Sequence, residues 1–147
     1  MKWTASDAAP ANARRVLPKL TRKFFKSGRK ACEPGISHRE LHGFRLKVKR
    51  YRYALEIFRP LYGPALEARL GVLQDLQQIL GKMSDAFAIR DLVAEDAALA
   101  RRLEDRGEKR IREFREFWTG TFDATGEEER WVGYLARYAG RKSPPSP

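Results

Sequence analysis

The sequence has few of the residues that metal, disulfide or membrane chemistry needs. Its single cysteine, Cys32, can form neither an intrachain disulfide nor a CxxC metal site. No run of apolar residues approaches the ~18 that a membrane span requires. The N-terminal residues lack the apolar segment of a secretory signal. We therefore expect a cytoplasmic protein that does not contact a membrane.

Strand signals are also missing, and this absence predicts an all-α protein. Alternating β-branched runs separated by Asn-Gly or Asp-Gly turns do not occur, while Ala, Leu, Arg, Glu and Lys dominate. The length of 147 residues fits one domain. We expect an antiparallel bundle of four to six helices over residues 12–140, between a flexible N-terminus (1–11) and a disordered Pro/Ser-rich tail (141–147).

Proline, glycine and capping residues predict where the helices begin and end. We expect helices over about 12–32, from Ser37 to about Pro60, and over about 64–81, 84–99, 100–121 and 127–139. Ser37 with Glu40 three residues later forms a capping box. Gly81 is expected to interrupt the chain between two helical segments.

Charge is distributed very unevenly along the chain. Residues 1–59 hold 16 Lys and Arg against 4 Asp and Glu, a net charge of +12. Residues 60–147 hold 14 against 15, a net charge of −1. An excess of one sign that is confined to one segment usually indicates a polyanionic partner, although a merely soluble basic surface is the simpler alternative.

The helix that begins after Ser37 carries a line of cations between two apolar surfaces. At about 100° per residue, one face collects a core stripe: Leu41, Phe44, Val48, Tyr51, Leu55 and Phe58. Another face collects what we call the second basic row: His38, His42, Arg45, Lys49 and Arg52. Leu46, Tyr53 and Ile57 lie on the far side of this row. A solvated helix face rarely has apolar residues on both sides, whereas the wall of a groove does.

The preceding helix repeats the pattern in a first basic row: Arg15, Lys19, Arg22, Lys26 and Arg29. Its spacing keeps the five side chains on one face of a helix. Few carboxylates lie in these two segments, so we expect both rows to be unneutralised. Phosphate is their natural ligand, because Arg and Lys bind its oxygens through charge-assisted hydrogen bonds. A solvated face is the alternative for the first basic row.

A metal site is the other chemical interpretation of His38 and His42. Their i, i+4 spacing on a helix can bind zinc. However, the sequence has no further histidine or second cysteine to complete the ligand set, and Arg39 and Arg45 would repel a cation. We therefore expect no bound metal. A hydrogen-bonding role for His42 within the bundle stays open.

Catalytic motifs are absent as well. The sequence contains neither G-x-S-x-G nor a P-loop, and Asp75, Asp85 and Asp91 are spaced too irregularly to form one tight cluster on a helix. Cys32 has no evident base partner. We expect a non-catalytic protein that needs no cofactor.

The segment "LHGFRLKVKRYRYALEIFRPLYG" resembles the signature helix of the CHAD (conserved histidine α-helical domain) family. That pattern is matched by His42, Arg45, Lys49 and Arg52, followed by "YALEIF" from Tyr53. The next helix, "RLGVLQDLQQILGKMSDAFAIRDLV", resembles a second family segment at Leu73, Gln74, Asp75, Leu80, Gly81 and Asp85. The resemblance extends over roughly residues 12–122.

This resemblance implies an all-helical protein that binds inorganic polyphosphate along a basic groove and associates with polyphosphate granules. Family members typically contain two pseudo-symmetric bundles, each with its own signature helix. This chain has one, and "KRYRYALE" is more similar to the second half of the family domain. Either the chain acts alone as an open basic wall, or two chains pair as a homodimer that completes the groove.

We thus expect a polyanion-binding module whose first candidate ligand is inorganic polyphosphate. The expected ligand contacts are His42, Arg45, Lys49 and Arg52 first, then Arg22, Lys26, Lys19 and Arg15, and finally Arg50 and His38. A nucleic-acid-binding or scaffold protein could use the same surface, but Tyr53 is the one aromatic residue beside the second basic row. An accessory subunit of a polyphosphate-metabolising enzyme is a further alternative.

Overall fold

The elements of the protein are helices, as the sequence predicts. The computed structural model describes residues 9–137, which contain α1 (Ala9–Ala31), α2 (His38–Ile57), α3 (Pro64–Leu92), α4 (Ala97–Phe117) and α5 (Glu127–Arg137). A short 3₁₀ turn, η1 (Arg59–Leu61), precedes α3, and a π-helical turn, η2 (Trp118–Phe122), follows α4. No β-strand occurs within residues 9–137.

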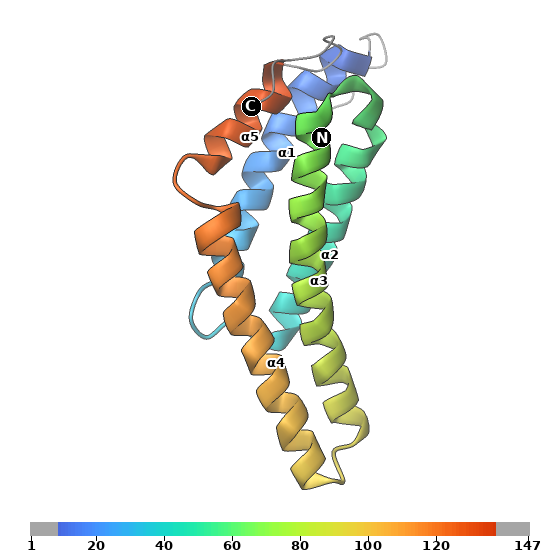
Figure 1. Ribbon diagram of the computed structural model, residues 1–147, viewed down its shortest axis with the longest axis vertical. Helices are drawn as coiled ribbons and strands as arrows, with labels where there is room; N and C mark the ends of the chain where they lie inside the picture. The colour runs from blue at the N-terminus through green and yellow to red at the C-terminus, as the bar shows by residue number, and fades with distance from the viewer. Residues whose placement is uncertain (1–8, 138–147) are drawn as a thin grey trace.

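The helices alternate in direction and form an antiparallel bundle (Figure 1). α1 contacts α2, α2 contacts α3, and α3 contacts α4. α4 packs on α3, whereas α5 packs on α1, so α4 and α5 together complete the bundle. The turn between α3 and α4 extends beyond the other helices, so the end of this hairpin projects from the bundle (Figure 1).

The core lies where the apolar stripes of the helices meet. All six residues of the expected stripe on α2, from Leu41 to Phe58, are buried. Aromatic rings from three segments fill the centre, where Phe24 of α1 stacks on Tyr51 of α2 with ring centroids 4.4 Å apart. Trp118 and Phe122 stack 4.7 Å apart beside them. Tyr51 also shares a buried hydrogen bond with Thr21, 2.6 Å from its hydroxyl, which links α1 to α2 within the core.

The N-cap of the capping box expected at the start of α2 is confirmed. Ser37 is the N-cap, and its Oγ accepts a hydrogen bond from the backbone N–H of Glu40 at 3.1 Å. The same hydroxyl lies 3.1 Å from Glu40 Oε1. This pairing satisfies a free N–H of the first turn, which fixes where the helix begins.

The expected interruption at Gly81 is wrong. α3 runs without a break from Pro64 to Leu92, so the segment expected over 84–99 is divided between the end of α3, a turn, and the start of α4. Leu80 and Met83, on either side of Gly81, are both buried in the core, and their packing outweighs the low helix propensity of one glycine. The chain reverses instead at residues 93–96, and Asp96 caps α4 by accepting from the N–H of Leu99 at 3.1 Å.

The remaining boundaries differ from the expected ones by a few residues. α1 begins at Ala9 rather than at residue 12, so residues 9–11 of the expected flexible N-terminus are helical. The other expected flexible residues and the expected tail over 141–147 lie outside the described residues. No helix among residues 9–137 is long and apolar enough to cross a membrane.

Candidate anion-binding surfaces

The second basic row lies on the side of α2 that faces α3. The guanidinium of Arg45 passes over Gly81 of α3, where a Cβ would lie 3.9 Å from its Nε and Nη2. Arg45 and Lys49 are half-buried, and neither has an ion-pair partner among residues 9–137. Arg52 is paired, because its Nε lies 3.3 Å from Glu56 Oε1 one turn later. The centre of the row is therefore unneutralised, as expected from the sequence.

The two histidines of this row have different surroundings. His42 is exposed. The ring of His38 stacks on Phe87 of α3 with centroids 3.7 Å apart, and its Nε2 lies 3.2 Å from Glu108 Oε1 of α4. His38 therefore connects the start of α2 to the α3–α4 hairpin, while His42 is accessible to a ligand.

Apolar side chains border the second basic row on its outer side. Leu46, Tyr53 and Ile57 are all exposed, and Ile57 keeps 75% of its accessible surface. The guanidinium of Arg52 lies over the ring of Tyr53, 5.1 Å from its centroid. The expectation that apolar surface flanks the row on both sides is confirmed: the core lies on one side and this exposed strip on the other.

α3 contributes polar side chains that the sequence analysis did not single out. Gln77 and Ser84 lie about one turn before and after Gly81, on the same face of α3. Gln77 Oε1 and Ser84 Oγ are buried and have no hydrogen-bond partner among the described residues. A serine and a glutamine beside a row of cations supply neutral donors and acceptors. Their role could be recognised only once Arg45 was seen to cross α3 at Gly81.

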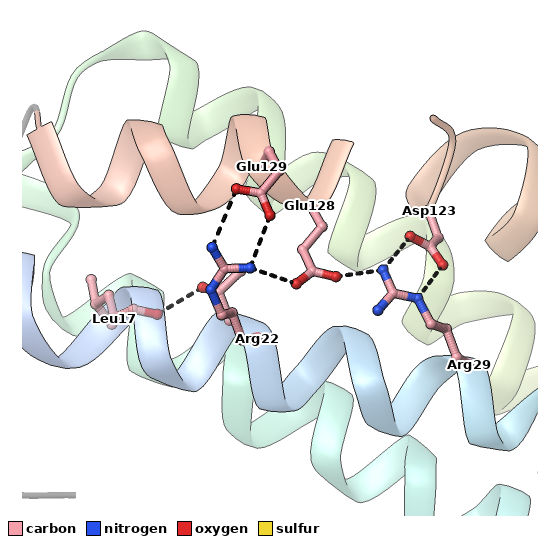
Figure 2. A network of polar contacts seen from close by, with 7 residues as sticks. Leu17, Arg22, Arg29, Asp123, Glu128 and Glu129 are labelled. Carbon is pink, nitrogen blue, oxygen red and sulfur yellow. Dashed lines mark hydrogen bonds and ion pairs between the residues drawn. The ribbon is translucent and has the colours of Figure 1, made fainter. Parts of the chain in front are cut away.

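The first basic row is not unneutralised, and in this respect the expectation is wrong. Arg22 Nη1 lies 2.9 Å from Glu129 Oε1 and 3.0 Å from Glu128 Oε2 (Figure 2). Arg29 Nε lies 2.8 Å from Asp123 Oδ2, and Arg29 also pairs with Glu128. Glu128 thus bridges both arginines, and the acidic residues come from the segment that leads into α5 and from its first turn (Figure 2).

These ion pairs shift the ionisation of their members. Hydrogen bonds from Arg22 hold the pKa of Glu129 below its ordinary value, and the bond to Glu129 raises the pKa of Arg22. The bond to Asp123 raises the pKa of Arg29. We call this set of contacts (Arg22 and Arg29 with Asp123, Glu128 and Glu129) the α1–α5 clasp. It pairs two cations of the first basic row, of which Arg22 is one of the expected ligand contacts.

The other members of the first basic row are arranged along the same side of α1. Lys19 and Lys26 are exposed and have no ion-pair partner among residues 9–137. Arg15 donates from Nη2 to Asn12 Oδ1 at 2.5 Å. Because the first row adjoins α5 and the second row adjoins α3, the two rows do not face each other across one groove.

Arg50 belongs to neither row. It lies at the edge of a groove between α1 and α2, together with Lys23 and Lys47, which the sequence analysis did not select. These three cations could be grouped only when the pairing of α1 with α2 was known.

α4 carries a further basic surface that includes Arg102, Arg106 and Lys109. The net charge of residues 60–147 did not reveal this basic surface, because acidic residues in the same segment cancel its charge.

The groups expected to carry no metal or catalytic chemistry have ordinary surroundings. Among residues 9–137, no three His, Cys, Asp or Glu side chains are grouped so that they could hold a metal ion. Cys32 is half-buried, and burial raises the pKa of its thiol to about 11, which disfavours the reactive thiolate at neutral pH.

The comparisons with known proteins agree with the resemblance noted in the sequence. The family model described as "CHAD domain" matches residues 1–94, which contain the second basic row and all of α3. No curated protein and no solved structure matches the chain.

Proposed function

The chain belongs to the CHAD domain family, and from this premise we propose that it is a non-catalytic module that binds inorganic polyphosphate through the second basic row. CHAD domains are associated with polyphosphate- and triphosphate-related proteins. The observation that carries the proposal is the pair Arg45 and Lys49, which lie one turn apart on α2 without a carboxylate partner among the described residues. His42 and Arg52 extend the row at either end.

The chemistry of the row suits a flexible polyanion. Arginine and lysine bind phosphate oxygens by charge-assisted hydrogen bonds that require no particular base or sugar. A polyphosphate chain carries closely spaced charges and can bend to follow a helix, so that successive phosphates meet successive cations. We propose that the protein acts in the cytoplasm. The same contacts with polyphosphate would associate it with polyphosphate granules.

A nucleic acid is the second candidate ligand, and one observation favours it. The ring of Tyr53 is half exposed beside the row and is already in contact with the Arg52 guanidinium, so a base could stack there. Phe44 and Tyr51, the other aromatic residues of α2, are buried in the core and offer no stacking surface. One exposed ring gives little support to a single-stranded nucleic acid, and none to a duplex.

Competition between ligands tests this proposal. Fluorescently labelled long-chain polyphosphate is titrated with the protein, and unlabelled polyphosphate, duplex DNA and single-stranded RNA compete at equal phosphate concentration. We expect polyphosphate to compete best and its affinity to fall steeply with salt, because binding releases counterions. If RNA or DNA displaces the labelled chain as well as polyphosphate does, the nucleic-acid function replaces the one proposed.

A further inference from the structure

The groove between α1 and α2 combines an apolar floor with a cationic rim. Leu20 and Phe24 of α1 and Tyr51 and Ala54 of α2 form the floor, and the groove encloses about 410 Å³. This volume lies in the range of small-molecule sites, roughly 300–1,000 Å³. Phe24 and Tyr51 are buried and stack on each other, so they close the bottom of the groove, whereas Leu20 and Ala54 are its more accessible apolar side chains.

The rim carries three cations and no carboxylate. Lys23 of α1 and Lys47 and Arg50 of α2 line it, and all three are exposed. None of the three has an ion pair or side-chain hydrogen bond within residues 9–137. Like charges held around an apolar floor repel one another, and a bound anion would offset that repulsion. The cations of the rim therefore favour a negatively charged ligand, and the apolar floor favours a ligand with an apolar body.

The dimensions of the groove limit the size of the ligand. Its lining extends from Leu20 to Ser27 on α1 and from Lys47 to Ala54 on α2, which is two helical turns on each side. At about 1.5 Å per residue this is roughly 10 Å. The lining positions on each helix follow the spacing i, i+3, i+4 and i+7, so they form one continuous wall, and the volume between the two walls is that of a small-molecule site. A short apolar body with one anionic group fits this length.

We propose that the α1–α2 groove is a second ligand site, which binds small amphiphilic anions: a medium-length aliphatic or an aromatic body that carries one carboxylate, sulfonate or phosphate. The apolar body lies between Leu20 and Ala54, above the buried rings at the bottom of the groove, and the anionic group pairs with Lys47 and Arg50 or with Lys23. This site is separate from the polyphosphate surface, because Arg45 faces α3 whereas Arg50 borders α1.

The test uses the full chain and the fluorescent anion 8-anilinonaphthalene-1-sulfonate. We expect saturable binding at one site, displaced by decanoate but neither by acetate, which lacks the apolar body, nor by decyltrimethylammonium, which has the same body with the opposite charge. All ligands are used below their micelle concentrations. Equal displacement by decanoate and decyltrimethylammonium would overturn the proposal, because the cationic rim would then contribute nothing.

Groove-filling variants locate the site. Ala54→Phe fills the groove from α2 and Ser27→Phe from α1, and each should weaken binding of the dye by about tenfold or more. Ala68→Phe, at an exposed position of α3 outside the groove, is the matched control and should bind the dye as the wild type does. Thermal melts show which variants are folded, because partly folded chains also bind this dye.

The results of these variants decide the proposal independently of the polyphosphate site. A folded Ala54→Phe or Ser27→Phe protein that binds the dye as tightly as Ala68→Phe overturns it. If both fail to fold, Lys47→Gln combined with Arg50→Gln decides instead: several-fold weaker binding of the dye supports the site, and unchanged binding overturns it. Ala54→Phe should keep its affinity for polyphosphate, so loss of one function does not imply loss of the other.

Discussion

Arginines of this protein have different surroundings although their side chains are the same. Arg45 lies over Gly81 of α3 with no carboxylate partner in the described part of the chain, whereas Arg29 is held by Asp123 and Glu128. A cation that already has two carboxylate partners gains little from a phosphate, because the ligand must first displace those partners. We therefore rank Arg45 and Lys49 above Arg22 and Arg29 as ligand contacts.

His42 should make polyphosphate binding depend on pH. Histidine gains its positive charge as pH falls from about 8 to 6. Because His42 is exposed one turn from Arg45, a positive charge on its ring would strengthen the attraction for a polyanion. We expect polyphosphate affinity, measured by fluorescence anisotropy, to increase over this range, and His42→Gln to flatten the dependence.

His38→Gln is the matched control for this measurement, because it removes the other histidine of the row. His38 is stacked on Phe87 and paired with Glu108, so its loss should leave the pH profile of binding largely intact. If His42→Gln retains the full profile instead, His42 does not face the ligand.

The α1–α5 clasp should affect stability rather than binding. The pKa of Glu129 is lowered in the folded protein by its hydrogen bonds with Arg22. A carboxylate whose pKa is lower in the folded state stabilises it at neutral pH, and this contribution is lost as pH falls below the ordinary value of about 4.5 and through the folded value. We expect Arg22→Gln to lower the melting temperature at pH 7 and to lower it by progressively less as the pH falls below 4.5, as followed by circular dichroism.

The same variant should bind polyphosphate nearly as well as the wild type does. A large loss of affinity in Arg22→Gln would mean that polyphosphate displaces Glu128 and Glu129 from α1, and that the first basic row is part of the site.

At the level of the elements, the π-helical turn determines how α4 is joined to α5. The N–H of Asp123 donates to the carbonyl of Trp118 at 2.7 Å, an i→i+5 bond that defines this turn. Trp118 and Phe122 both point into the core, and Asp123 is then within reach of Arg29. The ring of Trp118 packs directly against α1 at Gly28, where a Cβ would lie 2.0 Å from its Cη2.

Gly28→Ala should therefore destabilise the protein. The backbone of α1 and a fully buried indole would both have to shift, and overpacking of this kind costs about 1–3 kcal/mol. Denaturant unfolding measures the change. Gly71→Ala is the matched control: a Cβ at this helical glycine meets no atom within 4 Å. It should stabilise α3 by up to about 1 kcal/mol, because alanine is the better helix former. Equal effects of the two substitutions would contradict the packing described for Trp118.

Patterns within one helix were predictable from the sequence, and contacts between helices were not. The core stripe and the Ser37 N-cap of α2 follow from local spacing and chemistry, and both are confirmed. Gly81 misled the prediction because helix propensity is a local quantity, whereas burial of Leu80 and Met83 depends on the whole bundle. The partners of Arg22 lie more than a hundred residues away in the chain, so no local pattern indicates them. For the same reason the α1–α2 groove became visible only when the two helices were placed together.

At the scale of the whole molecule, the single bundle leaves the second basic row open to solvent on one side. The exposed strip of Leu46, Tyr53 and Ile57 beside it could be covered by a second copy of the chain. Two basic surfaces repel each other, and a polyanion held between them would offset that repulsion. We propose that polyphosphate promotes a two-fold homodimer.

Light scattering tests this proposal at increasing polyphosphate concentration. We expect the protein to be mainly monomeric without ligand and to dimerise when polyphosphate is added, and Ile57→Ser to weaken the dimer. A complex that keeps the mass of one protein chain at saturating protein would rule out the two-chain groove. It would leave the single basic wall as the site.

The most direct test of the account compares two triple variants that remove equal charge from different surfaces. Arg45→Gln, Lys49→Gln and Arg52→Gln together remove the second basic row beyond its histidines. Arg102→Gln, Arg106→Gln and Lys109→Gln remove three exposed cations of α4, so both proteins lose three positive charges. At moderate salt, we predict that the first variant stays folded and loses most of its affinity for polyphosphate, whereas the second stays within about twofold of the wild type. Equal losses in the two variants would contradict the account, because binding would then depend on net charge and not on the row along α2.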